Sequence, residues 1–251
     1  MRLQQFLSRA GYGARRKCEQ LILANRVMVN GRPAKLGMTV QPTDEVRVDG
    51  VLARQAEPKV YIALHKPVGY VSDRSNPGAR SVFELVRLPY HLFGVGRLDK
   101  DSSGLLLLTN DGDFAYRLTH PRFAHEKEYH VVVEGTPDEV ALQRWRQGVW
   151  LPGEQHRTLP CQVEVLKRQD VPPRATLRVV MREGRKRQIR RIARLLGYPV
   201  VSLVRVRIGG LWLGALQSGA WRYLHPEEVA MLTGEPPGGG SDDQPCSHDR
   251  H

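Results

Sequence analysis

A loop flanked by glycines, residues 96–104, runs directly into four consecutive leucines at residues 105–108. The leucines predict a buried strand, which requires a sizeable core around it. The loop holds Arg97 and Asp99, so a carboxylate lies at the end of a rigid element and remains accessible. By its pattern alone the loop is more typical of an exposed turn rich in charge and glycine. The rest of the sequence is needed to distinguish such a turn from a loop that positions a functional carboxylate.

The charge of the chain indicates an anionic partner. Over 251 residues the net charge is +12, and 30 of the 38 basic residues are arginine. Guanidinium groups bind phosphates in a bidentate manner, and the counterions that they displace from a nucleic acid add affinity. The length is sufficient for one large domain and one small domain.

The cysteines and the N-terminus point to a reducing compartment. Cys18, Cys161 and Cys246 are odd in number and widely scattered, so no disulfide framework is expected. The first residues lack a long apolar signal region, and no apolar run approaches the length of a membrane span. We therefore expect a soluble, monomeric, cytoplasmic protein that does not bind membranes.

Residues 1–50 are predicted to form a compact module of two helices followed by small strands. Apolar side chains at helical spacing end at Gly11, and a second helix is expected to start near Ala14. Alternating apolar residues at 27–29 and 46–48 each lead into a turn dipeptide, which is typical of hairpins.

A basic cluster, Arg15, Arg16 and Lys17, lies in the first turn of this second helix. The helix dipole disfavours cations there, but the free backbone N–H groups accept a phosphate, so the cluster is a candidate RNA-binding site. The alternative is a solvated basic face on a structural domain. Residues 14–17 and 26–31 match the recurring pattern of the S4 RNA-binding domain, which the whole module resembles.

The rest of the chain divides into a linker, a large domain and a tail. Residues 51–59 are polar, contain one proline and predict a linker between domains that can reorient. Over residues 60–234, strands mix with a few helices without a regular βα repeat. This favours an α+β fold with a mixed or antiparallel sheet. Residues 235–251 are rich in Pro, Gly, Ser and Asp and are expected to be disordered.

Several elements of the large domain are predicted individually. Apolar runs predict strands over 60–64, 129–133 and 175–181. A helix is expected over 188–196, because its apolar residues share one face, and Gly197 ends it. The four tryptophans are expected in the core or in packing between domains: Trp145, Trp150, Trp212 and Trp221.

Three separated segments carry candidate chemistry: the loop with Arg97 and Asp99, the strand start at 126–129, and the basic stretch at 184–191. A carboxylate, a tyrosine and arginines can hold an aromatic base above an acid in a phosphate-lined cleft, with Tyr129 as the stacking face. Taken singly, the segments are an ordinary turn, a strand start and a solvated helix face, and their spacing does not show that they converge.

These segments resemble those of the RsuA-type pseudouridine synthases, which modify bacterial ribosomal RNA. Four motifs match in order, at residues 63–69, 96–104, 125–129 and 183–191. With the S4-like module, the resemblance covers residues 1–232. Within the family, the second and fourth motifs are most similar to the RluB and RluF branches, which act on large-subunit rRNA.

The resemblance implies the reaction and the roles of individual residues. The glycosidic C–N bond of a uridine breaks and the uracil rejoins through C5, so no redox cofactor or metal is expected. The catalytic aspartate of the family matches Asp99, and its arginine matches Arg190. Tyr129 would stack on the uracil and assist removal of the C5 proton.

Other residues are assigned to substrate binding by the same resemblance. Ile189 would pack against the base from the other side, and Arg97 would help to hold the flipped nucleotide. Arg187 and the arginines near it would pair with phosphates or with Asp99. Extruding the uridine costs a few kcal/mol, which binding of the surrounding RNA offsets.

Alternatives remain open within and outside this class. The favoured partner is 23S rRNA, with 16S rRNA as the alternative, and the modified uridine is not defined. A non-catalytic RNA-binding protein would not need Asp99, Tyr129 and Arg190 together. A metal-dependent nuclease would use four aspartates: Asp99, Asp101, Asp111 and Asp113.

Overall fold

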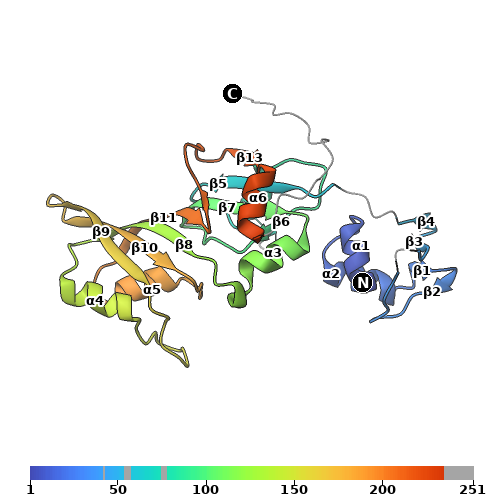
Figure 1. Ribbon diagram of the computed structural model, residues 1–251, viewed down its shortest axis with the longest axis horizontal. Helices are drawn as coiled ribbons and strands as arrows, with labels where there is room; N and C mark the ends of the chain where they lie inside the picture. Colours follow the sequence, from blue (N-terminus) through green and yellow to red (C-terminus); the bar gives the residue numbers. More distant parts are fainter. Residues whose placement is uncertain (42, 54–57, 75–77, 235–251) are drawn as a thin grey trace.

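A computed structural model describes residues 1–41, 43–53, 58–74 and 78–234 (Figure 1). The N-terminal part contains two helices and a small sheet with strand order β2-β1-β3-β4. Its elements are α1 (Leu3–Arg9), α2 (Arg15–Leu23), β1 (Val27–Val29), β2 (Arg32–Pro33), β3 (Val46–Val48) and β4 (Val51–Leu52).

The small module has a core of its own. Apolar side chains of both helices pack with alternate residues of β1 and β3, so the predicted helix starts and hairpin strands are confirmed. The turn residues Asn30 and Asp49 have positive φ angles of 49° and 51°, as tight hairpins require. β4 and Ala53, which we predicted as linker, belong to this sheet and core. Residues 54–57 lie outside the described part of the chain.

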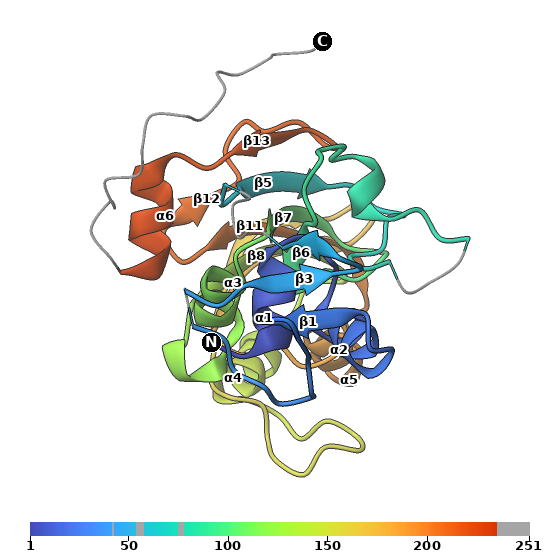
Figure 2. The same cartoon turned by 90° about the vertical axis from the view of Figure 1, so that its right-hand side faces the viewer.

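The second part is built on a large mixed sheet with strand order β13-β5-β7-β11-β8-β10-β9 (Figure 2). β6 pairs with β7, and β12 pairs with β11. β7 and β11 run parallel, whereas the other described pairs are antiparallel. The predicted α+β class is confirmed.

The bounds of these elements are as follows. The strands are β5 (Tyr61–Lys66), β6 (Phe93–Val95), β7 (Ser103–Thr109), β8 (Lys127–Glu134), β9 (Gln162–Gln169), β10 (Arg174–Met181), β11 (Val200–Ile208), β12 (Leu211–Trp212) and β13 (Trp221–Tyr223). The helices are α3 (Gly112–Thr119), α4 (Glu139–Gln147), α5 (Gln188–Leu195) and α6 (Pro226–Thr233), with 3₁₀ turns η1 (Val82–Glu84) and η2 (Pro121–Phe123).

The four leucines form the centre of β7 and are fully buried. Leu106 and Leu108 belong to the larger core cluster, whereas Leu105 and Leu107 belong to a second cluster that includes residues of α3 and α6. Successive side chains of a strand point to opposite faces, so a strand covered on both faces needs apolar residues at every position. This explains why the pattern is continuous and does not alternate.

Gly104 allows β7 and β11 to approach each other. Its φ is +109°, and a Cβ there would lie 2.3 Å from the carbonyl oxygen and 2.5 Å from the nitrogen of Arg205. Both atoms belong to the backbone of the parallel neighbour, in which Arg205 is paired with Gly104. The position therefore excludes every side chain.

Some predictions from the sequence are wrong, and some elements carried no signal. Trp145 is buried as expected, but Trp150 and Trp212 are 59% and 54% exposed. The sequence analysis did not identify α3, α4 and α6, each of eight or nine residues. No helix among the described residues is long and apolar enough to cross a membrane. The tail at 235–251, with Cys246, lies outside those residues.

We predict that Gly104→Ala lowers the free energy of unfolding by about 3 kcal/mol or more, because the backbone of β11 must move. Gly153→Ala is the matched control: Gly153 also has a positive φ, +80°, but nothing lies within 4 Å of a Cβ there. The control should lose only about 1 kcal/mol from backbone strain. Urea denaturation measures both, and equal losses would show that contact with Arg205 is not limiting.

Candidate active site

A cleft of about 510 Å³ lies where three segments of the large domain meet. Its walls come from the loop before β7, from Tyr129 in β8, and from the turn that leads into α5. These are the three segments that the sequence singled out, so the structure brings them together. Its volume falls in the range of roughly 300–1,000 Å³ that is usual for ligand pockets.

Asp99 and Asp101 occupy different positions relative to Arg187. Arg187 donates two hydrogen bonds to the Asp101 carboxylate, of 2.9 Å and 2.7 Å. The same Nη1 atom lies 3.8 Å from Asp99 Oδ2. The hydrogen bond from Arg187 keeps the pKa of Asp101 below its usual value, and burial opposes this effect. Asp99 keeps an accessible carboxylate, 38% exposed, at the wall of the cleft.

Arg190 contacts the loop rather than the carboxylate of Asp99. Its Nη2 donates to the Asp101 carbonyl oxygen at 2.6 Å and to Ser102 Oγ at 3.3 Å. Its Nε lies 3.4 Å from Asp101 Oδ2. Burial lowers the pKa of Arg190, and the charge of Asp101 counteracts this. The arginine nearest to Asp99 among the described ion pairs is thus Arg187.

Tyr129 and Ile189 supply apolar surface to the cleft. Tyr129 is 8% exposed and Ile189 5% exposed, and both line the cavity. Met181 and Leu203 line it as well. Such a cavity, lined by both apolar and charged side chains, suits a planar base attached to a phosphate chain.

Arg97 pairs with Asp73 and not with Asp99, although only Leu98 separates the two in sequence. Its side chain is 76% exposed and forms an ion pair with Asp73 at 3.0 Å. Arg97 also lines the cleft, so a weakly held cation stands at its entrance.

Comparison with known protein families supports the resemblance noted from the sequence, both for the small module and for the large domain. The S4 domain family matches residues 1–46, and the family described as RNA pseudouridylate synthase matches residues 60–194. The chain belongs to the RNA pseudouridylate synthase family. It is therefore an enzyme that converts uridine in RNA to pseudouridine.

Individual relatives are similar over nearly the whole chain. The ribosomal large subunit pseudouridine synthase B of Bacillus subtilis (strain 168) is 37% identical over 92% of this chain and 95% of its own length. The dual-specificity RNA pseudouridine synthase RluF of Escherichia coli (strain K12) is 36% identical over 92% and 78%. A crystal structure titled pseudouridylate synthase has a TM-score of 0.68 at 30% identity and covers 92% of this chain and 99% of its own.

Lys66 is a residue of the synthase site that sequence reasoning did not assign. Its side chain is fully buried, and Nζ donates to the carbonyl oxygens of Ser102 at 2.6 Å and Pro67 at 3.0 Å. Burial lowers its pKa to about 8, while Asp101 and Asp99 act in the opposite direction. Lys66 therefore fixes the end of the loop that carries Asp99. The sequence feature that could have identified Lys66 is the motif at residues 63–69, which contains it and matches the family.

We predict that replacing this lysine changes how stability depends on pH. Between about pH 8 and pH 10.4, Lys66 is mostly neutral in the folded chain but still charged in the unfolded chain. The unfolded chain then binds more protons, so the wild type gains stability relative to Lys66→Met as the pH rises, by up to ~3 kcal/mol.

Urea denaturation at pH 7.5 to 10.5 measures this difference. The exposed Lys167 on β9 provides the control, Lys167→Met, whose curve should stay parallel to that of the wild type. Parallel curves for Lys66→Met would contradict the prediction.

The basic cluster of the small module lies apart from the cleft. Arg15, Arg16 and Lys17 are exposed at the start of α2, and none of them lines the cavity. No side chain caps this helix start, and its first turn contains no acid. Arg15 lies beside Gly112 at the start of α3, where Arg9 pairs with Asp113.

The four aspartates of the nuclease interpretation do not converge. Asp99 and Asp101 precede β7 and Asp111 and Asp113 follow it, and a strand of seven residues separates the pairs by ~20 Å. Asp111 caps α3 and accepts hydrogen bonds from the backbone of Asp113 and from Tyr61. Within the described ranges, no group of three or more metal-ligating side chains is found. The geometry contradicts the nuclease interpretation.

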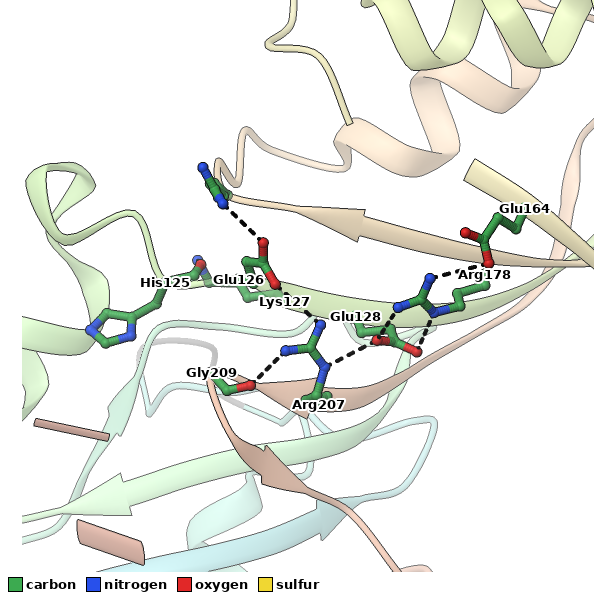
Figure 3. A network of polar contacts seen from close by, with 9 residues as sticks. His125, Glu126, Lys127, Glu128, Glu164, Arg178, Arg207 and Gly209 are labelled. Carbon is green, nitrogen blue, oxygen red and sulfur yellow. Dashed lines mark hydrogen bonds and ion pairs between the residues drawn. The ribbon is translucent and has the colours of Figure 1, made fainter. Parts of the chain in front are cut away.

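A network of acids and arginines supports β8 beside the cleft (Figure 3). The buried Glu128 accepts from Arg178 Nε at 2.9 Å and from Arg207 Nε at 3.0 Å, and so joins β8 to both neighbouring strands. Glu126 accepts from Arg182 and Arg207. Tyr129 follows this network directly, so the strand that positions it is held from both sides.

Proposed function

We propose that this synthase isomerises a uridine of 23S rRNA and that Asp99 is its catalytic carboxylate. The observation that supports this role is the difference between the two aspartates of the loop. Arg187 and Arg190 engage Asp101, whereas the Asp99 carboxylate forms one ion pair within the described residues, at 3.8 Å, and lines the cleft. A carboxylate that attacks or stabilises a reacting centre needs an ionised oxygen that other groups have not saturated. Asp99 meets this requirement.

In this proposal the cleft holds the flipped uridine between apolar walls. Tyr129 stacks on one face of the uracil and Ile189 packs against the other. Arg97, exposed at the entrance, holds the extruded nucleotide, and Arg187 supplies the counter-charge for the loop carboxylates. Arg190, the expected catalytic arginine, acts by holding the backbone of the loop that carries Asp99.

The chemistry requires no group beyond these side chains. The bond between C1′ and N1 breaks, the detached uracil turns, and C1′ bonds to C5. The proton on C5 leaves with the assistance of Tyr129, and N1 gains one, so the product is an isomer of the substrate. Asp99 acts at the sugar or at the base, and in either role it must be ionised.

We predict that Asp99→Asn lowers turnover by about 10³-fold or more, because the amide has the shape of the carboxylate without its charge. Release of tritium from RNA labelled at C5 of uridine measures turnover, and filter binding measures the affinity, which should change little. Asp170→Asn, which changes an exposed aspartate beyond β9, is the control and should retain full activity. Substantial turnover by Asp99→Asn would remove Asp99 from this role.

The choice of 23S rRNA is supported by the relatives and by the small module. One relative is named for the large ribosomal subunit. The exposed cluster of Arg15, Arg16 and Lys17 at an uncapped helix start suits a phosphate of structured RNA. We propose that this module adds affinity for rRNA outside the cleft, and that the enzyme works in the cytoplasm as a monomer.

We predict tritium release from a 23S transcript and much less from a 16S transcript under the same conditions. Two modules must bind one particular RNA shape while a single uridine is extruded, so few uridines should react. Release from 16S alone would reject the large-subunit substrate but leave the enzyme class intact. Release from transfer RNA alone would reject ribosomal RNA as the substrate.

A further inference from the structure

A second cavity, of about 230 Å³, lies next to the catalytic cleft. The two share Arg97, Tyr129 and Gly184 as lining residues, so a chain that leaves one cavity can enter the other directly. The second cavity extends from the backbone of the catalytic loop toward β8 and the segment after α3. None of the roles assigned above uses it.

Its walls carry more positive charge than the acids around it compensate. Arg97, Lys127, Arg182 and Arg205 line this cavity, and none of its described lining residues is acidic. Arg97 and Arg182 have carboxylate partners, Asp73 and Glu126. Over the described residues, Lys127 and Arg205 form no ion pair with an acid. A buried cation without a counter-charge is costly unless a ligand supplies one.

Arg205 is the more deeply buried of the two. It is 2% exposed, and its Nε and Nη1 donate to the carbonyl oxygens of Leu105 at 2.7 Å and Arg97 at 3.5 Å, whereas its Nη2 finds no partner in the part of the chain that the structure describes. Lys127 has a single hydrogen bond among the described residues, to the His125 carbonyl oxygen at 3.3 Å. Burial lowers the pKa of Lys127, and the charge of Arg205 lowers it further. Two cationic side chains thus line one small cavity, and each retains N–H groups that donate no hydrogen bond to the described residues.

The opposite face of β8 shows that acids are absent only from the side of the strand that faces the cavity. Lys127 and Tyr129 alternate with Glu128 along β8, Glu126 directly precedes the strand, and alternate residues face opposite sides of a strand. The two glutamates neutralise arginines of neighbouring strands (Figure 3). Acids are therefore available within one residue of Lys127, but they lie on the face away from the cavity.

We propose that the second cavity binds a phosphate of the RNA backbone adjacent to the uridine in the catalytic cleft, with Lys127 and Arg205 supplying the charge. This inference rests on the proposed function, since it assumes that the cleft holds a flipped nucleotide. The next phosphate of an RNA chain lies one nucleotide away, and the shared wall of Arg97 and Tyr129 joins the two sites. The contact places the uridine and carries no information about sequence.

The first test compares Lys127→Met with Lys167→Met, which removes the same charge from the exposed strand β9. With the RNA that the wild type modifies, Lys127→Met should raise KM about tenfold, with a smaller effect on kcat. It should also lower the slope of log affinity against log salt by about one. Lys167→Met should change neither by more than about twofold. A wild-type KM and salt slope for Lys127→Met would overturn the proposal.

A second test changes the charge of the RNA, so that the loss of binding is first measured on the wild type. A methylphosphonate, which removes the charge of one linkage, replaces the phosphate immediately 5′ or 3′ of the modified uridine. One of the two positions should weaken binding to the wild type about tenfold and binding to Lys127→Met less than twofold. Equal losses for both proteins at both positions would overturn the proposal.

These results separate the phosphate site from the proposed function. If the wild type releases tritium from an RNA other than 23S rRNA, the proposed substrate is wrong, and both tests proceed with the RNA that reacts. If the wild type is active on 23S rRNA, but Lys127→Met keeps the wild-type KM and salt slope and each methylphosphonate weakens binding to both proteins equally, the phosphate site alone is wrong.

Discussion

The parallel pairing of β7 with β11 is the contact on which the active site depends. On one side of this junction lie β13, β5 and β7, with the loop that carries Asp99. On the other side lie β11, β8, β10 and β9, with Tyr129 and the helix α5. The cleft forms where the two halves of the sheet meet, so neither half contains it alone. Gly104 is required because the backbones approach more closely than a Cβ permits.

Arginine side chains reinforce this junction by donating to backbone oxygens. Arg205 reaches from β11 to Leu105, and Arg190 reaches from α5 to the carbonyl of Asp101. Carbonyl oxygens near strand ends and loops lack a full set of partners, and a guanidinium group can satisfy several of them at once. Part of the arginine excess therefore holds the fold together. The net charge of +12 correctly indicates an anionic partner, but it overstates how many basic side chains are free to bind that partner.

The sequence predicted the elements whose signals are local. Four leucines covered on both faces, the turn dipeptides of the small module and the apolar face of α5 all depend on neighbouring residues, and each prediction is confirmed. The charge partners could not be predicted in the same way. Arg187 and Asp101 lie 86 residues apart, and whether Arg187 or Arg190 approaches Asp99 depends on the turn that starts α5. Arg187 adopts a left-handed conformation there, with a φ of 52°. No pattern of residue types predicts this conformation.

In the proposed function, Asp101 keeps the arginines of the site from occupying the carboxylate of Asp99. An arginine close to a lone aspartate would form the bidentate pair with it and occupy both of its oxygens. Asp101 takes that role, since Arg187 binds both of its oxygens and Arg190 adds a further contact. Arg187 stays near Asp99, at 3.8 Å, without covering its carboxylate. The proposal thus assigns the pairing with arginines to Asp101 and the reaction to Asp99, while Lys66 fixes the loop backbone at Ser102.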